Sequence, residues 1–82
     1  MTIVTVYTSG PSCAACTMTK RHLARRGIDY TEVPIDSDPG IFESAQELDL
    51  RQAPIVCASV DGEERYWWGY RPDSIDALMG GK

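Results

Sequence analysis

The sequence predicts an α/β fold with four strands in one mixed sheet and three flanking helices, in the order β-α-β-α-β-β-α. Two observations support this prediction. Short runs of β-branched and aromatic residues, which suit buried strands, are separated in the first half of the chain by longer segments with helical spacing. In the second half, two strand-like runs flank Asp61-Gly62, a dipeptide typical of hairpin turns. A strand-helix-strand connection implies parallel strands and the hairpin adds an antiparallel pair, so the sheet is mixed.

The first three elements occupy residues 2–35. Residues 2–8 alternate threonine with apolar residues and predict a buried strand, which Ser9-Gly10-Pro11-Ser12 ends. Residues 13–26 contain neither glycine nor proline and predict a helix, with Gly27 as its stop. Residues 28–35 predict the second strand.

The second helix is predicted from residue 39 to residue 48. Asp38 is a suitable cap, and Pro39 fits the first turn. Its expected inner stripe consists of Phe42, Ala45, and Leu48 or Leu50.

The last three elements follow Pro54. Residues 55–59 predict a buried strand, and residues 64–68 can return antiparallel to it. Pro72 marks the entry to a final helix, which Asp73 can cap. This helix is expected to extend through residue 78 and to end at Gly80-Gly81.

Length and charge narrow the function. The 82 residues fit one domain, residues 1–82, which we expect to be monomeric. A net charge of -4 argues against nucleic acid as the main partner, because phosphate binding needs a basic surface. No run approaches the roughly 18 apolar residues of a membrane span, and residues 1–8 lack the features of a signal peptide. We therefore expect a cytoplasmic protein with no membrane association.

Cys13 and Cys16 are the candidate catalytic residues. In a reducing compartment, two cysteines separated by two residues are more often redox-active or metal-binding than a structural staple. Cys13 lies at the start of the predicted first helix, where unpaired amides and the helix dipole favour a thiolate. Cys13 would attack a substrate disulfide as the nucleophile, and the more buried Cys16 would resolve the mixed disulfide. This reversible Cys13–Cys16 disulfide requires no bound cofactor.

A zinc site is the structural alternative for the cysteine pair, because such a pair can supply half of a tetrahedral site. Two further ligands are needed. Cys57 lies in a predicted buried strand, where we interpret it as a small apolar residue outside the site. His22 lies mid-helix and is interpreted as a surface residue. Since neither forms a second pair of ligands, we expect no metal; a metal-binding or redox-sensing module is the remote alternative.

Several motifs resemble the thioredoxin and glutaredoxin superfamily over nearly the whole chain. They are the order of elements, Cys13-Ala14-Ala15-Cys16 after the first strand, and Ala53-Pro54 before the third. Trp67-Trp68-Gly69-Tyr70-Arg71-Pro72-Asp73 is similar to the Trp-Ser-Gly-Phe-Arg-Pro element of NrdH-redoxins, the glutaredoxin-like hydrogen donors of class Ib ribonucleotide reductase. Gln52-Ala53-Pro54-Ile55-Val56 fits the same family. The resemblance implies a thioredoxin fold.

The resemblance also implies an activity and partners. An NrdH-redoxin is a dithiol-disulfide oxidoreductase that takes electrons from NADPH through thioredoxin reductase and passes them to the large subunit of class Ib ribonucleotide reductase. Glutathione is not its expected reductant, and the Gly-Gly-x-Asp-Asp type of segment with which glutaredoxins hold glutathione is missing here. The alternative is a glutaredoxin or mycoredoxin relative, which reduces mixed disulfides with a low-molecular-weight thiol and can work with Cys13 alone.

Further site residues follow from the resemblance. Pro54 resembles the cis-proline that faces the cysteines. A cis bond there would turn the backbone of Ala53 towards an incoming peptide, which could add as a strand. The residues expected to contact the partner are Ala53, Pro54, Trp67, Trp68, Gly69, Tyr70 and Arg71, with Pro11 and Asp73 as structural residues near the site.

Three residues of this set also have a plain structural interpretation. Trp67 and Trp68 point to opposite faces of a strand, so one should lie in the core and the other should be at least partly exposed. Arg71 either clamps a carboxylate of the partner or pairs on the surface with Asp73 or Asp76.

Four features depart from the family pattern. Residues 9–12 approach the first cysteine through a loop one residue longer than usual, Ala14-Ala15 replaces a bulkier pair, Trp68 stands where the family often has serine, and Cys57 is extra. None of these changes removes a catalytic group. The longer loop and Trp68 lie beside the predicted active surface, so they bear on how a partner docks.

Overall fold

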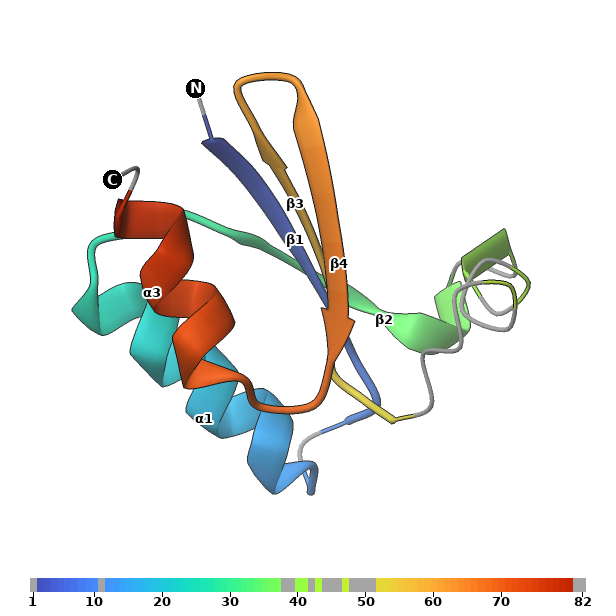
Figure 1. Cartoon of the computed structure of the whole chain (residues 1–82). Helices are drawn as coiled ribbons and strands as arrows, with labels where there is room; N and C mark the ends of the chain where they lie inside the picture. Colours follow the sequence, from blue (N-terminus) through green and yellow to red (C-terminus); the bar gives the residue numbers. More distant parts are fainter. Residues whose placement is uncertain are drawn as a thin grey trace.

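The computed structural model describes residues 2–10, 12–37, 40, 41, 43, 47 and 52–80. In chain order the elements are β1 (Thr2–Thr8), α1 (Ala14–Arg25), β2 (Thr31–Pro34), the 3-10 helix η1 (Ile35–Ser37), β3 (Ile55–Val60), β4 (Glu63–Trp68) and α3 (Pro72–Gly80) (Figure 1). Within these described segments, no helix is long and apolar enough to span a membrane.

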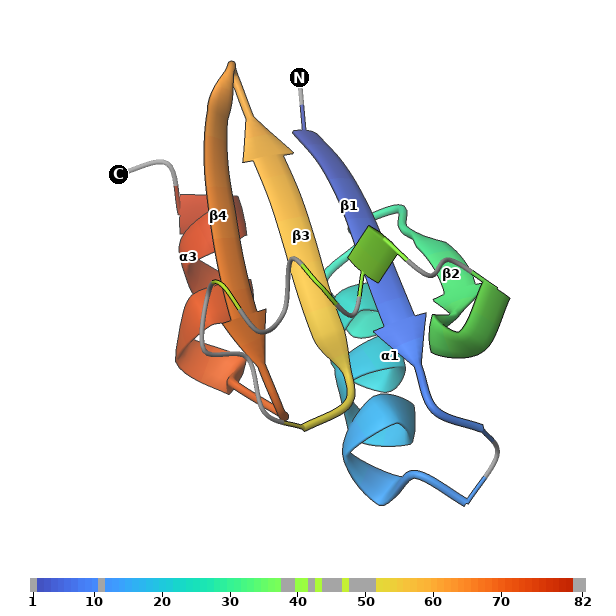
Figure 2. The same cartoon turned by 90° about the vertical axis from the view of Figure 1, so that its right-hand side faces the viewer.

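The four strands form one mixed sheet, which confirms the predicted fold class. Their order is β2-β1-β3-β4. β1 runs parallel to β2 and antiparallel to β3, and β4 runs antiparallel to β3. Figure 2 shows the strands side by side, with α1 and α3 behind them. β1 is therefore a central strand, and the chain passes from its carboxyl end to the cysteine pair.

Both helices pack on the same face of the sheet and share one core with it. Alternate residues of β1 turn inward, so that Val4 and Val6 are buried while their neighbours are not. The core cluster consists of Val4, Val6, Leu23, Val56, Ala58, Trp67, Ile75 and Leu78. Since burying one large apolar side chain stabilises a fold by about 1.5–3 kcal/mol, this cluster fixes α1 and α3 against the sheet.

The second strand is shorter than predicted, because its expected start completes the end of α1. Gly27 has a left-handed conformation, with φ of +73°. The N–H groups of Gly27 and Ile28 donate to the carbonyl oxygens of Ala24 and Leu23, at 3.0 and 2.9 Å. This pair of bonds satisfies the last carbonyls of the helix, and β2 begins only at Thr31.

The hairpin between β3 and β4 forms where the sequence predicts it. Asp61 and Gly62 both have positive φ angles, 52° and 89°, which is the geometry of a type I′ turn. The turn fixes the register that places Trp67 opposite Val56 and Trp68 opposite Ile55.

The start of α3 differs from the prediction by one residue. The helix begins at Pro72, so Asp73 lies in its first turn and is not the cap. Proline suits the first helical position because it has no N–H group to satisfy. The N–H of Ile75 donates to the carbonyl oxygen of Arg71 at 3.1 Å, which makes Arg71 the residue before the helix. The Asp73 carboxylate still complements the helix dipole.

The predicted second helix lies largely outside the described residues. Gly40, Ile41, Glu43 and Glu47 are described and have helical conformation, and Ile41 is buried. The cap, the first-turn proline and the inner stripe fall on Asp38, Pro39, Phe42, Ala45, Leu48 and Leu50, which are outside the described residues. The third flanking helix therefore stays a prediction. The last helix, predicted through residue 78, is helical through Gly80.

Candidate active site

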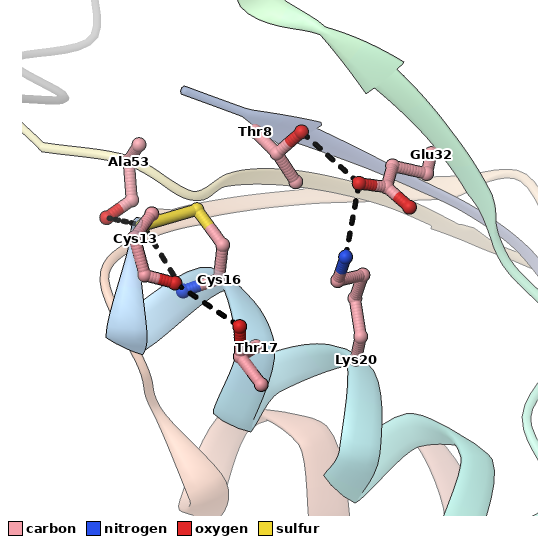
Figure 3. Close-up of a disulfide and its surroundings, with 7 residues drawn as sticks. All are labelled: Thr8, Cys13, Cys16, Thr17, Lys20, Glu32 and Ala53. Atoms are coloured by element: carbon pink, nitrogen blue, oxygen red, sulfur yellow. Dashed lines mark hydrogen bonds and ion pairs between the residues drawn. A yellow bond between two sulfur atoms is a disulfide. The ribbon is translucent and has the colours of Figure 1, made fainter. Parts of the chain in front are cut away.

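Cys13 and Cys16 form a disulfide at the amino end of α1 (Figure 3). Their Cα atoms lie 5.2 Å apart. Cys13 is the N-cap of the helix in extended conformation, and its N–H donates to the carbonyl oxygen of Gly10 at 3.2 Å. The N–H and the hydroxyl of Thr17 both donate to the carbonyl oxygen of Cys13, at 3.1 and 3.3 Å. These bonds hold the first cysteine between the loop and the helix.

The surroundings of the two sulfur atoms differ. The N–H of Cys16 donates to the Sγ of Cys13 at 3.1 Å, and the first turn of α1 carries no acidic residue. A helix N-terminus stabilises negative charge, so this position suits a thiolate at Cys13 in the reduced protein. Cys13 is half-buried, whereas Cys16 is 1% exposed. An incoming disulfide can therefore reach Cys13 but not Cys16.

Ala53 and Pro54 lie directly beside Cys13. The peptide bond between them is cis, as the resemblance implied, and Pro54 is fully buried. The carbonyl oxygen of Ala53 is 3.9 Å from the Sγ of Cys13, which Figure 3 shows as the contact between the loop and the disulfide. The carbonyl oxygen of Pro54 accepts a hydrogen bond of 2.9 Å from the N–H of Gly69. Through this bond, residues 67–71 join the site.

The 67–71 segment has one residue in the core and a mostly accessible remainder. Trp67 is 6% exposed and belongs to the core cluster, while Trp68 is half-buried, which confirms the expected split between the two faces. Gly69 turns the chain with φ of +76°. The ring of Tyr70 packs against the core, and the exposed Arg71 lies 3.6 Å (Nε to Oδ1) from Asp73.

Of the two interpretations of Arg71, the structure shows the surface pair with Asp73. Both side chains are more than half exposed, and such pairs contribute little to stability. Asp76, the other candidate partner of Arg71, is engaged by different residues.

The prediction that His22 is a surface residue is wrong. His22 is 9% exposed because it lies on the side of α1 that faces α3. Its Nδ1 is 2.8 Å from the hydroxyl of Tyr70, and its Nε2 is 2.8 Å from Oδ1 of Asp76. The Nε of Arg26 is 3.0 Å from the same oxygen. The hydrogen bond from His22, together with the charge of Arg26, holds the pKa of Asp76 below its usual range.

A second polar group joins α1 to β1 and β2. The Nζ of Lys20 is 3.0 Å from Oε2 of Glu32, and the hydroxyl of Thr8 donates to the same oxygen at 3.2 Å (Figure 3). The hydrogen bond from Lys20 holds the pKa of Glu32 below its usual range. An open pocket of about 360 Å³ is lined by Thr8, Ser9, Gly10, Thr17, Lys20, Glu32 and Pro34. Sequence reasoning missed Glu32, because only the register of β1 and β2 brings it here.

The remaining candidates lie outside this arrangement. Cys57 is a free, half-buried thiol on β3. Burial, with Glu64 nearby, raises its pKa, which favours the protonated thiol. Pro11, predicted as a structural residue near the site, is outside the described residues. Across the described ranges, no three His, Cys, Asp or Glu side chains gather as a metal site would require.

Comparisons with known proteins agree with this arrangement. A family model described as Glutaredoxin matches residues 4–64, a range that includes both cysteines and Pro54 but ends before the 67–71 segment. The chain is 35% identical over 75 residues to the glutaredoxin-like protein NrdH of Escherichia coli K12, covering 92% of this chain and 86% of that protein. It is 30% identical over 76 residues to the protein of the same name from Lactococcus lactis subsp. cremoris, covering 93% and 99%.

The solved structure of a relative matches the fold. NrdH-redoxin from Escherichia coli, a glutaredoxin-like protein described as having a thioredoxin-like activity profile, aligns with a TM-score of 0.77 and 34% identity over 93% of each chain. The predicted thioredoxin fold is thereby confirmed.

Proposed function

This chain belongs to the glutaredoxin family and within it to the NrdH-redoxins, and from that premise we propose that it works as a dithiol electron carrier. The proposed electron source is NADPH through thioredoxin reductase. The proposed acceptor is the active-site disulfide in the large subunit of class Ib ribonucleotide reductase. Family membership makes the chain a glutaredoxin-like redox protein of an oxidoreductase family.

The observation that carries the proposal is the asymmetry of the disulfide. Cys13 caps the helix, accepts the N–H of Cys16, and is partly open to solvent, while Cys16 is shielded one turn further along α1. Dithiol exchange needs one sulfur that is accessible and stabilised as a thiolate, and a second sulfur that waits nearby without contacting the substrate. This geometry supports Cys13 as the nucleophile and Cys16 as the resolving residue.

The proposed exchange proceeds in two balanced steps. The Cys13 thiolate attacks one sulfur of the partner's disulfide, so a mixed disulfide forms and the other partner sulfur leaves as a thiolate that takes up a proton. Cys16 then loses its proton and attacks the Sγ of Cys13, which forms the internal disulfide and releases the second partner sulfur. Two electrons pass to the partner, whose two sulfur atoms take up the proton released by Cys16 and one proton from solvent, and thioredoxin reductase returns two electrons from NADPH.

The partner's polypeptide is proposed to dock where three segments of this chain meet. The carbonyl of Ala53 lies next to Cys13, and the hydrogen bond from Gly69 to Pro54 places the 67–71 segment beside them. A peptide that adds along this backbone would bring its disulfide towards Cys13. Trp68, Tyr70 and Arg71 would then contact the partner, which agrees with their partial or full exposure.

The choice of thioredoxin reductase over glutathione has two supports. The chain lacks the glycine- and aspartate-containing segment with which glutaredoxins hold glutathione, and its relative from Escherichia coli has a thioredoxin-like activity profile. The choice of ribonucleotide reductase as acceptor is supported by the resemblance of residues 67–73 to the NrdH-redoxin element.

The testing experiment is NADPH oxidation with a model protein disulfide, supplied in parallel with thioredoxin reductase or with glutathione and glutathione reductase. Turnover with thioredoxin reductase alone supports the proposal. Turnover with glutathione alone would instead identify a reductase of mixed disulfides that uses a low-molecular-weight thiol. The acceptor is tested separately by asking whether the reduced protein restores class Ib ribonucleotide reductase that has been oxidised.

A single substitution separates the dithiol and monothiol mechanisms. Cys16→Ser removes the resolving sulfur, so a dithiol carrier should stop after one mixed disulfide, and its turnover should fall by about a hundredfold or more. Mass spectrometry should detect the trapped adduct on Cys13. Cys57→Ser is the matched control, and it should retain turnover because Cys57 lies apart from the disulfide.

A further inference from the structure

A polar network centred on the buried His22 joins α1 to the 67–71 segment, and we infer that His22 is a positioning residue for partner docking. The inference rests on the proposed function, because it assigns His22 the task of holding a segment that the partner is proposed to contact. His22 does not touch the reacting sulfur atoms. It acts through Tyr70.

The hydrogen bonds of the network determine the role of each imidazole nitrogen. Oδ1 of Asp76 can only accept a hydrogen bond, so the Nε2 that lies 2.8 Å away carries a proton. In the tautomer that carries its proton on Nε2, the Nδ1 accepts from the hydroxyl of Tyr70, also at 2.8 Å. Arg26, the C-cap residue of α1, binds the same oxygen of Asp76. Asp76 therefore fixes the orientation of the ring at Nε2, and Nδ1 is left to hold the hydroxyl of Tyr70.

The network fastens the 67–71 segment at a second point. The first point is the backbone bond between the N–H of Gly69 and the carbonyl of Pro54, which involves no side chain. The second point is the Tyr70 hydroxyl on His22, which depends on these two side chains. Gly69 and Tyr70 are adjacent, so the two bonds hold neighbouring residues against different parts of the site.

His22 also lies on the helix that carries the disulfide. Cys13 caps α1, and His22 belongs to the same helix, whose buried face includes Cys16 and Leu23. The spacing between the cysteine pair and the Tyr70 ring is thus set by a rigid helix and one hydrogen bond. Positioning groups of this kind affect how well a partner binds more than how fast the bound partner reacts.

The test compares two substitutions that each keep half of the network. In His22→Gln, the longer amide can reach Asp76 but leaves Tyr70 unheld; in His22→Asn, the shorter amide sits where Nδ1 was and can still accept from Tyr70. The measurement is the rate of thioredoxin reductase as the concentration of this protein is varied. His22→Gln should raise KM about threefold to tenfold with kcat within about twofold, the loss expected for one buried hydrogen bond, while His22→Asn should change KM by less than about twofold.

Further variants complete the design. Tyr70→Phe should raise KM as His22→Gln does, and the double variant should be no worse than either, because both remove the same bond. Arg21→Gln, an exposed neighbour on α1, is the matched control and should match the wild type. Hydrogen exchange at the Gly69 amide should be faster in His22→Gln and unchanged in His22→Asn, since this amide reports the bond to Pro54.

The outcomes that would contradict the inference are also defined. Equal KM values and equal Gly69 exchange in His22→Gln and wild type would overturn it. If His22→Gln lowered kcat as much as it raised KM, the inference would also be overturned, because His22 would then have a general structural role. A lower rate of His22→Gln with a small aromatic disulfide, which has no surface for docking, would lead to the same conclusion. If the wild type gave no turnover with thioredoxin reductase, the proposed function would fail, and Gly69 exchange would still decide whether His22 holds the segment.

Discussion

Two polar networks tie α1 to its neighbours, one towards β2 and one towards α3, and they differ in burial. Lys20, Glu32 and Thr8 form the first at the edge of an open pocket, where both charged side chains remain partly exposed. The second centres on His22, whose side chain is 11% exposed, while its charged members Asp76 and Arg26 are 45% and 48% exposed. Water can replace a lost partner of Lys20 or Glu32 more readily than a lost partner of the buried His22 ring. Removing a contact of His22 should therefore lower the unfolding free energy more than removing a contact of similar length between Lys20 and Glu32.

The largest effect is expected in the apolar core, which serves as the reference for both networks. Leu23→Ala truncates a side chain that is fully buried next to His22, and it should cost about 3 kcal/mol of unfolding free energy because a cavity remains. Urea denaturation followed by circular dichroism measures it. Met18→Ala, at an exposed position of the same helix, should cost less than about 0.5 kcal/mol. Equal losses in the two variants would contradict the account of the core.

The next largest loss of stability is expected in the network centred on His22. Tyr70→Phe keeps the ring but leaves Nδ1 of His22 without its donor, so the unfolding free energy should fall by about 1 kcal/mol. Tyr66→Phe is the matched control, because the Tyr66 hydroxyl bonds Glu64 on the exposed surface of β4. A loss from the control as large as that from Tyr70→Phe would remove burial as the explanation.

The exposed network should respond more weakly and should depend on salt. Lys20→Met removes the ion pair with Glu32 and should cost between about 0.2 and 1 kcal/mol at low ionic strength. In about 1 M sodium chloride the difference from wild type should nearly vanish, because salt screens exposed charges. Paired urea titrations at the two salt concentrations measure this. A difference that persisted in high salt would place this pair with the buried network.

The smallest effect should appear on acidification. The pKa values of Glu32 and Asp76 are both lowered in the folded protein, so each carboxylate stabilises the fold above its unfolded pKa. That contribution is lost as pH falls through the lowered folded pKa. Between pH 6 and pH 2, Tm should therefore fall less in Glu32→Gln and in Asp76→Asn than in wild type. Exposed Glu63→Gln serves as the control, and an equal fall in all four proteins would refute the assignment.

The parts of the molecule that depend on local sequence could be predicted. The Asp61-Gly62 hairpin, the stop at Gly27 and the burial of one tryptophan of β4 follow from residue preferences over a few positions. The cysteine pair at the start of α1 was evident for the same reason, because a strand, a loop and a helix in succession define that junction. The Ala53–Pro54 cis bond was expected from the resemblance alone.

The parts that depend on distant contacts could not be predicted. His22 is a lone histidine in a helix, and only the packing of α1 against α3 shows that Tyr70 and Asp76 lie at its two nitrogens. Glu32 meets Lys20 because β2 pairs with β1 in a particular register, with Glu32 opposite Val6. Cys16 and Thr19 mark the buried face of α1, and the position of His22 one turn beyond Thr19 was the available signal for a buried polar residue.

The neighbouring tryptophans of β4 give the protein two optical reporters in one emission spectrum. Trp67 is enclosed by the core, so we expect its fluorescence to be blue-shifted, shielded from quenchers such as acrylamide, and sensitive to unfolding. Trp68 is half-buried on the opposite face, next to Gly69, so we expect its emission to be more red-shifted and open to quenching. In unlabelled protein, the emission wavelength can therefore follow folding. Quenching can separately follow the binding of a partner to the 67–71 segment.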